Sequence, residues 1–194
     1  QAIEAAQKQT QRMVMVGFNR RFAPMATALK KFLADVSEPL FVHYRVNAGF
    51  IPQEHWIQDP AVGGGRLIGE AVHFIDFVNW IAGTAPVAVD ACALPDSGRY
   101  KSDNFTITLQ YANGSVAQIA YVANGHRSFG KERIEVHTGG RSAVLDDFRS
   151  LRLMGRRTES SRSWLGSDKG HAAECQSFMD AVRNGGPSPI PFEE

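Results

Sequence analysis

Residues 104–122 read NFTITLQYANGSVAQIAYV, and this stretch indicates the fold class most directly. Apolar and polar side chains alternate on both sides of Asn113-Gly114, which is the pattern of two half-buried strands. The Asn-Gly pair is a strong signal for the tight turn of a β-hairpin. The stretch therefore predicts strands at 104–111 and 115–122 that pair within one antiparallel sheet.

Further segments extend this sheet and add helices. Alternating or β-branched patterns predict five more strands, at 39–48, 86–94, 132–138, 142–147 and 150–154. Apolar residues at helical spacing predict helices at 23–34, 66–82 and 171–184. The segment 157–170 is rich in Ser, Arg and Gly, and we expect it to be a mobile loop. Helices and consecutive hairpins segregate along the chain, which predicts an α+β fold: an open, mostly antiparallel β-sheet with helices packed on one face.

The N-terminal segment predicts a different order of secondary-structure elements. Residues 1–11 predict an amphipathic helix, and Met13–Val16 is a continuous apolar run that is typical of a strand buried on both faces. Helix followed by buried strand is the unit of a parallel α/β domain. We therefore expect residues 1–17 to be the C-terminal remnant of a dinucleotide-binding domain. Residues 18–194 are then expected to form a substrate-binding and oligomerisation domain.

The composition argues against several classes of partner. Lys and Arg number 21 against 20 Asp and Glu, so a net charge of +1 gives no electrostatic case for nucleic acid or for a membrane surface. No apolar run approaches the roughly 20 residues of a membrane-spanning helix. Cys92 and Cys175 lie far apart without a CxxC partner, which predicts reduced thiols and a cytoplasmic protein. The six histidines show no metal-binding spacing, so we expect no metal.

The chemistry is concentrated in residues 63–83, GGGRLIGEAVHFIDFVNWIAG. On a helix, one stripe is apolar and is expected to face the core: Leu67, Ala71, Phe74, Val78 and Ile81. The opening Gly63-Gly64-Gly65 is not a dinucleotide fingerprint, and it follows a loop rather than a strand. Its expected role is to let the backbone approach a ligand or a neighbouring domain closely.

Three polar residues of this helix, Glu70, His73 and Asp76, recur at i, i+3 and i+6 on another side. A carboxylate beside an imidazole fixes its tautomer and raises its basicity, so His73 is a candidate acid/base and Glu70 its orienting partner. The alternative is that His73 is a surface or interface group. Asp76 is the member most expected to be structural, for example by pairing with an arginine.

Three motifs together resemble the Gfo/Idh/MocA oxidoreductases: GFNRRF at 17–22, the helix motif at 63–83, and SPIPFEE at 188–194. The stretch NAGFIPQEHWIQDP at 47–60, leading into GGGRLIGE, is similar to one branch of that family. In that branch the module follows a zinc-type alcohol-dehydrogenase-like domain in one long polypeptide.

The resemblance implies an N-terminal Rossmann domain that binds NAD or NADP, in the same polypeptide and ahead of residue 1. It implies that the sheet domain makes oligomer contacts and that substrate lies between the domains. His73 matches the catalytic histidine of the family, whereas Asn19 and Arg20 match the link between domains, next to cofactor and substrate. The catalytic lysine of the family belongs to an EKP motif ahead of residue 1. One departure is Gly69, where many members have Asp.

We therefore interpret the chain as the substrate-binding domain of an NAD- or NADP-dependent oxidoreductase acting on a sugar or polyol carbinol, inactive by itself. Asn19, Arg20, His55, Trp56 and Asp76 are the expected substrate contacts, although simple loop packing is an equal explanation for His55 and Trp56. Two alternatives stay open: an NAD-dependent glycosidase, and a non-catalytic sugar-binding or assembly module.

We also expect a homo-oligomer that forms through the exposed face of the sheet. Ile107, Leu109, Ile119 and Tyr121 include residues that could line this face, and the alternative is that they face the helices.

Overall fold

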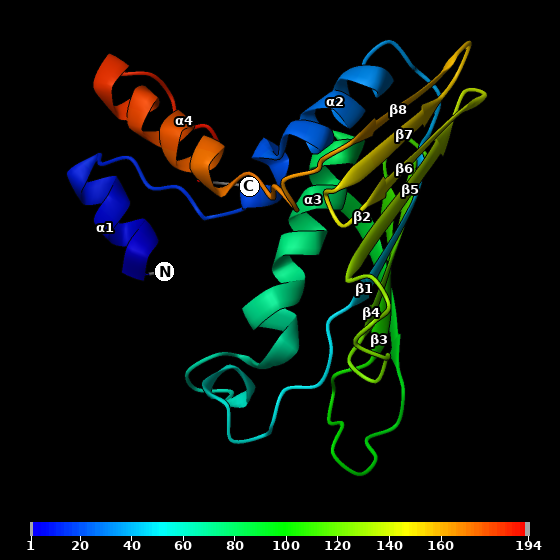
Figure 1. The fold of residues 1–194 in the computed structure, drawn as a ribbon. Helices are drawn as coiled ribbons and strands as arrows, with labels where there is room; N and C mark the ends of the chain where they lie inside the picture. The colour runs from blue at the N-terminus through cyan, green and yellow to red at the C-terminus, as the bar shows by residue number, and fades with distance from the viewer. Residues whose placement is uncertain (1, 193–194) are drawn as a thin grey trace.

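The computed structural model describes residues 2–192, so the last two residues of the SPIPFEE motif, Glu193 and Glu194, lie outside the described residues. One sheet of eight strands organises the chain, in the order β2-β3-β4-β1-β5-β6-β7-β8 (Figure 1). The strands are Phe41–Asn47 (β1), Pro86–Ala93 (β2), Phe105–Tyr111 (β3), Val116–Val122 (β4), Glu132–Thr138 (β5), Arg141–Asp146 (β6), Ser150–Met154 (β7) and Thr158–Arg162 (β8).

Every neighbouring pair of strands is antiparallel except the pair β1 and β4, which is parallel. The predicted hairpin forms at β3 and β4, where the Tyr111 N–H donates to the Ser115 carbonyl at 3.0 Å. Gly114 has a φ of +83°, which a residue with a side chain rarely adopts. The α+β class and the mostly antiparallel sheet are confirmed.

Four α-helices accompany the sheet in the described part of the chain: Ala2–Thr10 (α1), Pro24–Leu33 (α2), Val72–Ala82 (α3) and His171–Asn184 (α4). Helices α2 and α3 pack on one face of the sheet, as predicted, whereas α1 and α4 lie to one side of it (Figure 1). Gly83, in the left-handed conformation at φ +77°, ends α3 where the sequence predicts. No helix within residues 2–192 is long and apolar enough to cross a membrane.

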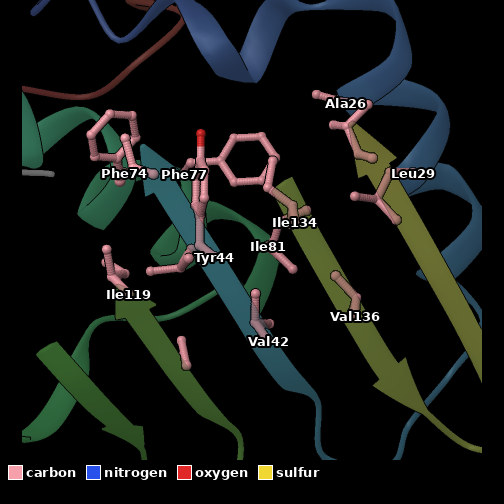
Figure 2. Packing of buried hydrophobic residues seen from close by; sticks show 14 of the residues in the cluster. Ala26, Leu29, Val42, Tyr44, Phe74, Phe77, Ile81, Ile119, Ile134 and Val136 are labelled. Atoms are coloured by element: carbon pink, nitrogen blue, oxygen red, sulfur yellow. The ribbon is translucent and has the colours of Figure 1, made fainter. Parts of the chain in front are cut away.

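The core lies between this helical layer and the sheet (Figure 2). Alternate residues of β1, represented by Val42, Tyr44 and Val46, point toward the helices and are at most 1% exposed. Phe74 and Phe77 of α3 meet Tyr44 edge-on, with ring centroids 5.2 and 5.6 Å away. Each large apolar side chain buried in this way contributes about 1.5–3 kcal/mol to folding.

The same alternation corrects the residues expected on the exposed face. Ile107, Leu109, Ile119 and Tyr121 are all buried toward α3, at 0–5% exposure, so none of them lines the open face and the alternative, that they face the helices, holds for all four. Apolar residues at every second position go to whichever face is covered, and here the helices cover it. The open face carries the intervening, mainly polar side chains, among them His43, Arg45, Thr106, Thr108, Gln118 and Glu135.

Two expected elements differ in the structure. Residues 13–16 form no strand, because a strand needs a hydrogen-bonded neighbouring strand and none pairs with them in the described chain. Residues 158–162, expected to be loop, form the edge strand β8 on β7. All five residues of β8 are exposed, so no apolar alternation marks them in the sequence.

Candidate functional site

The segment that carries Glu70 and His73 is not one continuous α-helix. Leu67–Ala71 forms a π-helical turn, and α3 begins at Val72. A π turn holds an extra residue, so it rotates the preceding positions away from the stripe of a regular helix. Leu67, predicted to be core, is accordingly 45% exposed, and that prediction is wrong. The other four residues of the stripe are buried.

Glycines allow this turn to pack against the loop before it. A Cβ on Gly69 would lie 2.6 Å from Ile57 Cγ1, and a Cβ on Gly63 would lie 2.3 Å from Ile57 Cα. Gly64 and Gly65 have φ values of +72° and +74°. The close approach that the structure shows is to the loop of the same chain around Ile57, and the expected approach to a ligand or a neighbouring domain stays a prediction.

His73 lies in the first turn of α3, half-buried under the edge of Phe18, with the two ring centroids 5.7 Å apart. Its Nδ1 is buried and has no hydrogen-bond partner among the described residues, which leaves Nε2 as the more accessible nitrogen. Burial, followed by the positive charge of Arg20, holds the pKa of His73 below its ordinary value. The imidazole is therefore neutral at neutral pH and able to accept a proton.

Arg20 is held rigidly in the short 3-10 turn Asn19–Phe22. Its Nε donates to Glu132 Oε2 at 2.8 Å and its Nη2 to Oε1 at 3.0 Å, a bidentate pair in which both side chains are at most 8% exposed. Arg20 also lies over the Phe74 ring, 4.7 Å from its centroid. The two bonds to Glu132 engage Nε and Nη2 and leave Nη1 on the far side of the guanidinium from that carboxylate.

Glu132 is the centre of a buried polar network. Besides its pair with Arg20, its carboxylate accepts a hydrogen bond from the Tyr44 hydroxyl at 2.5 Å and forms an ion pair with Lys169. Burial by itself would raise the pKa of Glu132, but the Arg20 and Lys169 contacts outweigh it and lower the pKa to about 2. The carboxylate is therefore charged at any ordinary pH and fixes the guanidinium beside His73.

Glu70 makes its bonds to other partners than His73. Its carboxylate accepts from the Tyr121 hydroxyl at 2.5 Å and from Lys131 Nζ at 2.8 Å, with Arg66 Nη2 at 3.3 Å. Burial alone would raise the pKa of Glu70, but the bonds from Lys131 and Tyr121 hold it below its ordinary value. Glu70 acts on His73 through its charge, which favours the protonated imidazole, and not through a hydrogen bond.

Asp76 lies one turn further along α3 and is engaged by Arg21. The Arg21 Nε donates to Asp76 Oδ2 at 2.8 Å, and its Nη2 donates to Oδ1. Asp76 is 5% exposed, and both residues line a cavity of about 490 Å³ together with Phe18. The pairing with an arginine that the sequence indicates is therefore present.

The remaining predicted contacts are divided between two places. Asn19 is 4% exposed and donates through Nδ2 to the Lys169 carbonyl at 2.7 Å, close to Arg20. His55 begins a short 3-10 turn, where its Nδ1 accepts from the Ile57 N–H at 3.3 Å. Trp56 is 60% exposed. The structure thus brings Arg20, Glu70 and His73 together around one point and leaves His55 and Trp56 on the loop before the π turn.

Sequence reasoning missed five residues of this site: Tyr44, Tyr121, Lys131, Glu132 and Lys169. They come from three strands and two loops, and no motif joins them. The only sequence signal is the acidic residue Glu132 at a position where the alternation of β5 predicts a buried side chain. No group of three or more His, Cys, Asp or Glu within the described chain has the arrangement of a metal site.

Comparisons with known proteins identify the family and the fold of the chain. The family described as "Oxidoreductase family, C-terminal alpha/beta domain", of the Gfo/Idh/MocA group, matches residues 36–194. Inositol 2-dehydrogenase from Rhizobium meliloti (strain 1021) is 32% identical over 146 residues, which cover 70% of this chain and 42% of that protein. The chain therefore spans less than half the length of this curated relative.

Solved structures share the fold at low identity. Levoglucosan dehydrogenase in complex with NADH and levoglucosan has a TM-score of 0.81 at 20% identity, covering 99% of this chain and 62% of that one. The UDP-N-acetylglucosamine 3-dehydrogenase GnnA from Acidithiobacillus ferrooxidans has a TM-score of 0.76 at 22% identity, covering 96% and 58%. These likenesses support the sheet architecture, and the chain again spans only part of each relative.

Proposed function

Since this chain belongs to the Gfo/Idh/MocA oxidoreductase family, as its C-terminal α/β domain, we propose that it is the substrate-binding domain of an NAD- or NADP-dependent dehydrogenase. The proposed substrate is a sugar or polyol, oxidised at a carbinol carbon. The dehydrogenase relatives support this reaction class, and two of them are named for inositol and levoglucosan.

The observation that carries the proposal is the state of His73. The imidazole is neutral, half-buried and held beside the Arg20 guanidinium, with no described residue bonded to either ring nitrogen. A neutral imidazole next to a fixed cation is suited to accept a proton from a substrate hydroxyl at Nε2. Arg20 would donate through Nη1 to the substrate oxygen, since Nε and Nη2 are held by Glu132.

The chemistry balances with one base and one hydride acceptor. A nicotinamide cofactor, when bound, would supply the acceptor for the hydride that leaves the carbinol carbon. As the hydride leaves, His73 takes the proton of the substrate hydroxyl. The alcohol becomes a carbonyl compound, and the imidazole becomes an imidazolium. Glu70 and Glu132 stabilise that imidazolium by their charges, which favour the protonated form of His73. The proposed role of Glu70 is thus electrostatic support.

The cofactor would be bound mainly outside this chain. Within residues 2–192 no strand leads into a glycine turn and helix of the kind that holds a pyrophosphate. We propose that residues 1–17 end a Rossmann domain and that residues 18–194 form the substrate and oligomer domain, with Asn19 and Arg20 contributing at the junction. We also propose that a zinc-type alcohol-dehydrogenase-like domain precedes this module in the same polypeptide.

The other contacts expected from the sequence are also proposals. His55 and Trp56, on the loop before the π turn, would close over the substrate, and the open face of the sheet would pair two copies of the chain. Asp76 is better explained by its bond to Arg21 than by substrate contact.

The test is hydride transfer by the full polypeptide that contains this domain, assayed with NAD⁺ and with NADP⁺ against inositols, anhydrosugars and pyranoses. We expect reduced cofactor and an oxidised product in equal amounts. Hydrolysis of a glycoside without net cofactor reduction would instead establish the glycosidase alternative. The isolated 194-residue chain should show no tight cofactor binding in calorimetry, and tight binding would contradict the division of roles.

A further inference from the structure

A second cavity, of about 460 Å³, lies at the end of β1 against the loop at 127–131 and the short segments 147–149 and 167–169. Four cationic side chains line it, namely Arg127, Lys131, Arg149 and Lys169, against one carboxylate, Asp147. The whole chain carries a net charge of only +1, so this excess is local and is not a property of the general surface. We refer to this cavity as the basic pocket.

The carboxylates nearest the basic pocket are already committed to other groups. Asp147 accepts the backbone N–H groups of Glu132 and Lys131, at 2.5 and 3.2 Å. Lys131 pairs with Glu70 and Lys169 with Glu132, but these two carboxylates are also shared by Arg66 and Arg20. The four cations of the pocket together with Arg20 and Arg66 make six positive charges, and Glu70, Glu132 and Asp147 make three negative charges. Positive charge therefore remains uncompensated.

Two of the cations are free to bind a ligand. Arg127 and Arg149 are exposed, and within the described chain neither side chain makes a hydrogen bond or ion pair. The loop that carries Arg127 is held in place by Asn47, whose Nδ2 donates to the carbonyls of His126 and Phe129, both at 2.9 Å. The arginine therefore projects from a fixed loop, which lowers the entropy cost of binding.

The basic pocket adjoins the proposed site of proton transfer. Lys131 and Lys169 line the pocket with their side chains and end on Glu70 and Glu132, the two carboxylates whose charges act on His73. Each lysine thus connects the wall of the basic pocket to a carboxylate that acts on the His73 imidazole. A ligand of sugar size that reaches His73 would place a substituent among these cations.

We propose that the basic pocket binds a carboxylate or phosphate group carried by the substrate. Arginine side chains recognise both groups through paired N–H donors, and the shared chemistry is that of an oxyanion. This inference rests on the proposed function, because it takes the ligand to be the sugar-type molecule that His73 serves. It narrows the substrate class from sugars and polyols in general to acidic ones, such as a sugar acid or a sugar phosphate.

The test is calorimetric titration of this 194-residue chain with glucose 6-phosphate, gluconate, glucose, inorganic phosphate and NADP⁺. We expect the two charged sugars to bind at least 10-fold more tightly than glucose, with an affinity that weakens as KCl is raised. Arg127→Gln and Arg149→Gln should each reduce that affinity about 10-fold, as loss of one charged hydrogen bond does. Arg157→Gln, at an exposed arginine that does not line the pocket, is the matched control and should change nothing.

Three outcomes would overturn the inference. Equal affinity for glucose and the charged sugars would remove the anion site, as would charged-sugar affinities that the two pocket variants leave unchanged. NADP⁺ binding that is tighter than that of the charged sugars and depends on Arg127 and Arg149 would assign the pocket to the cofactor.

The inference and the proposed function fail in different ways. Turnover of neutral sugars by the full polypeptide, without charged-sugar binding here, would refute only the anion site. Charged-sugar binding without any nicotinamide-linked turnover would refute only the dehydrogenase assignment.

Discussion

The two sides of α3 are made from adjacent residues and have opposite requirements. One side, with Phe74, Phe77 and Ile81, is at most 2% exposed and packs mainly against apolar side chains and ring edges, with Arg20 over the Phe74 ring as a charged neighbour. The other side, with His73 and Asp76, faces the turn that contains Arg20 and Arg21. Apolar packing is insensitive to pH and salt, whereas the polar side depends on charges that are held in place by the first side.

The largest expected effect belongs to the polar side. In the full polypeptide, His73→Asn should lower turnover by about 10²–10⁴-fold, the usual contribution of a general base. Because the imidazole makes no described hydrogen bond, the free energy of unfolding should fall by no more than about 1–2 kcal/mol. Melting temperature and single-turnover hydride transfer measured on one preparation check both statements. A well-folded variant with normal transfer would remove His73 from the mechanism.

The apolar side should show the reverse pattern. Phe77→Ala should lower the free energy of unfolding by about 3–5 kcal/mol, because it removes a ring that packs against Tyr44, Trp80 and Phe148. The molecules that remain folded should transfer hydride at nearly the normal rate. Urea denaturation measures the loss. Val87→Ala, at a valine that is 68% exposed, is the control and should cost within about 0.5 kcal/mol.

Asp76 tests whether a buried ion pair on the polar side stabilises the fold. Asp76→Asn should cost about 2–3 kcal/mol, because it leaves Arg21 buried beside a neutral amide. Asp35→Asn breaks a pair with Arg141 whose aspartate side chain is 73% exposed, and it should cost clearly less, because water screens an exposed pair. Equal losses in the two variants, measured by urea denaturation, would show that burial does not distinguish the pairs.

The smallest effect is the pH dependence of stability that His73 causes. Burial lowers the pKa of His73 in the folded chain, so below pH about 6.5 the unfolded chain takes up the proton first. The stability due to the neutral imidazole is therefore full above that pH and declines as pH falls toward the folded pKa. The slope of stability against pH should be shallower in His73→Asn. An unchanged slope would contradict the lowered pKa.

The fold was largely predictable because its signals are local. Asn113-Gly114 and alternation mark β3 and β4, and Gly83 marks the end of α3, since turn geometry and burial leave direct traces in residue type. Two segments, 13–16 and 158–162, were predicted wrongly because pairing with a neighbouring strand decides whether a strand forms. The π turn at Leu67–Ala71 was also missed, since it depends on how Gly69 packs against Ile57.

The residues of the candidate site also differ in whether local sequence signals could predict them. His73 and Arg20 could be named in advance because they stand in motifs, and the pairing of Asp76 with an arginine was anticipated from residue type. The partners of Glu70 could not be named, because Tyr121 and Lys131 follow it by 51 and 61 residues. Glu132 joins Arg20 across 112 residues. Residue type and periodicity determine which groups are available and which face is buried, but ion pairs over such separations exist only once the sheet has set its register.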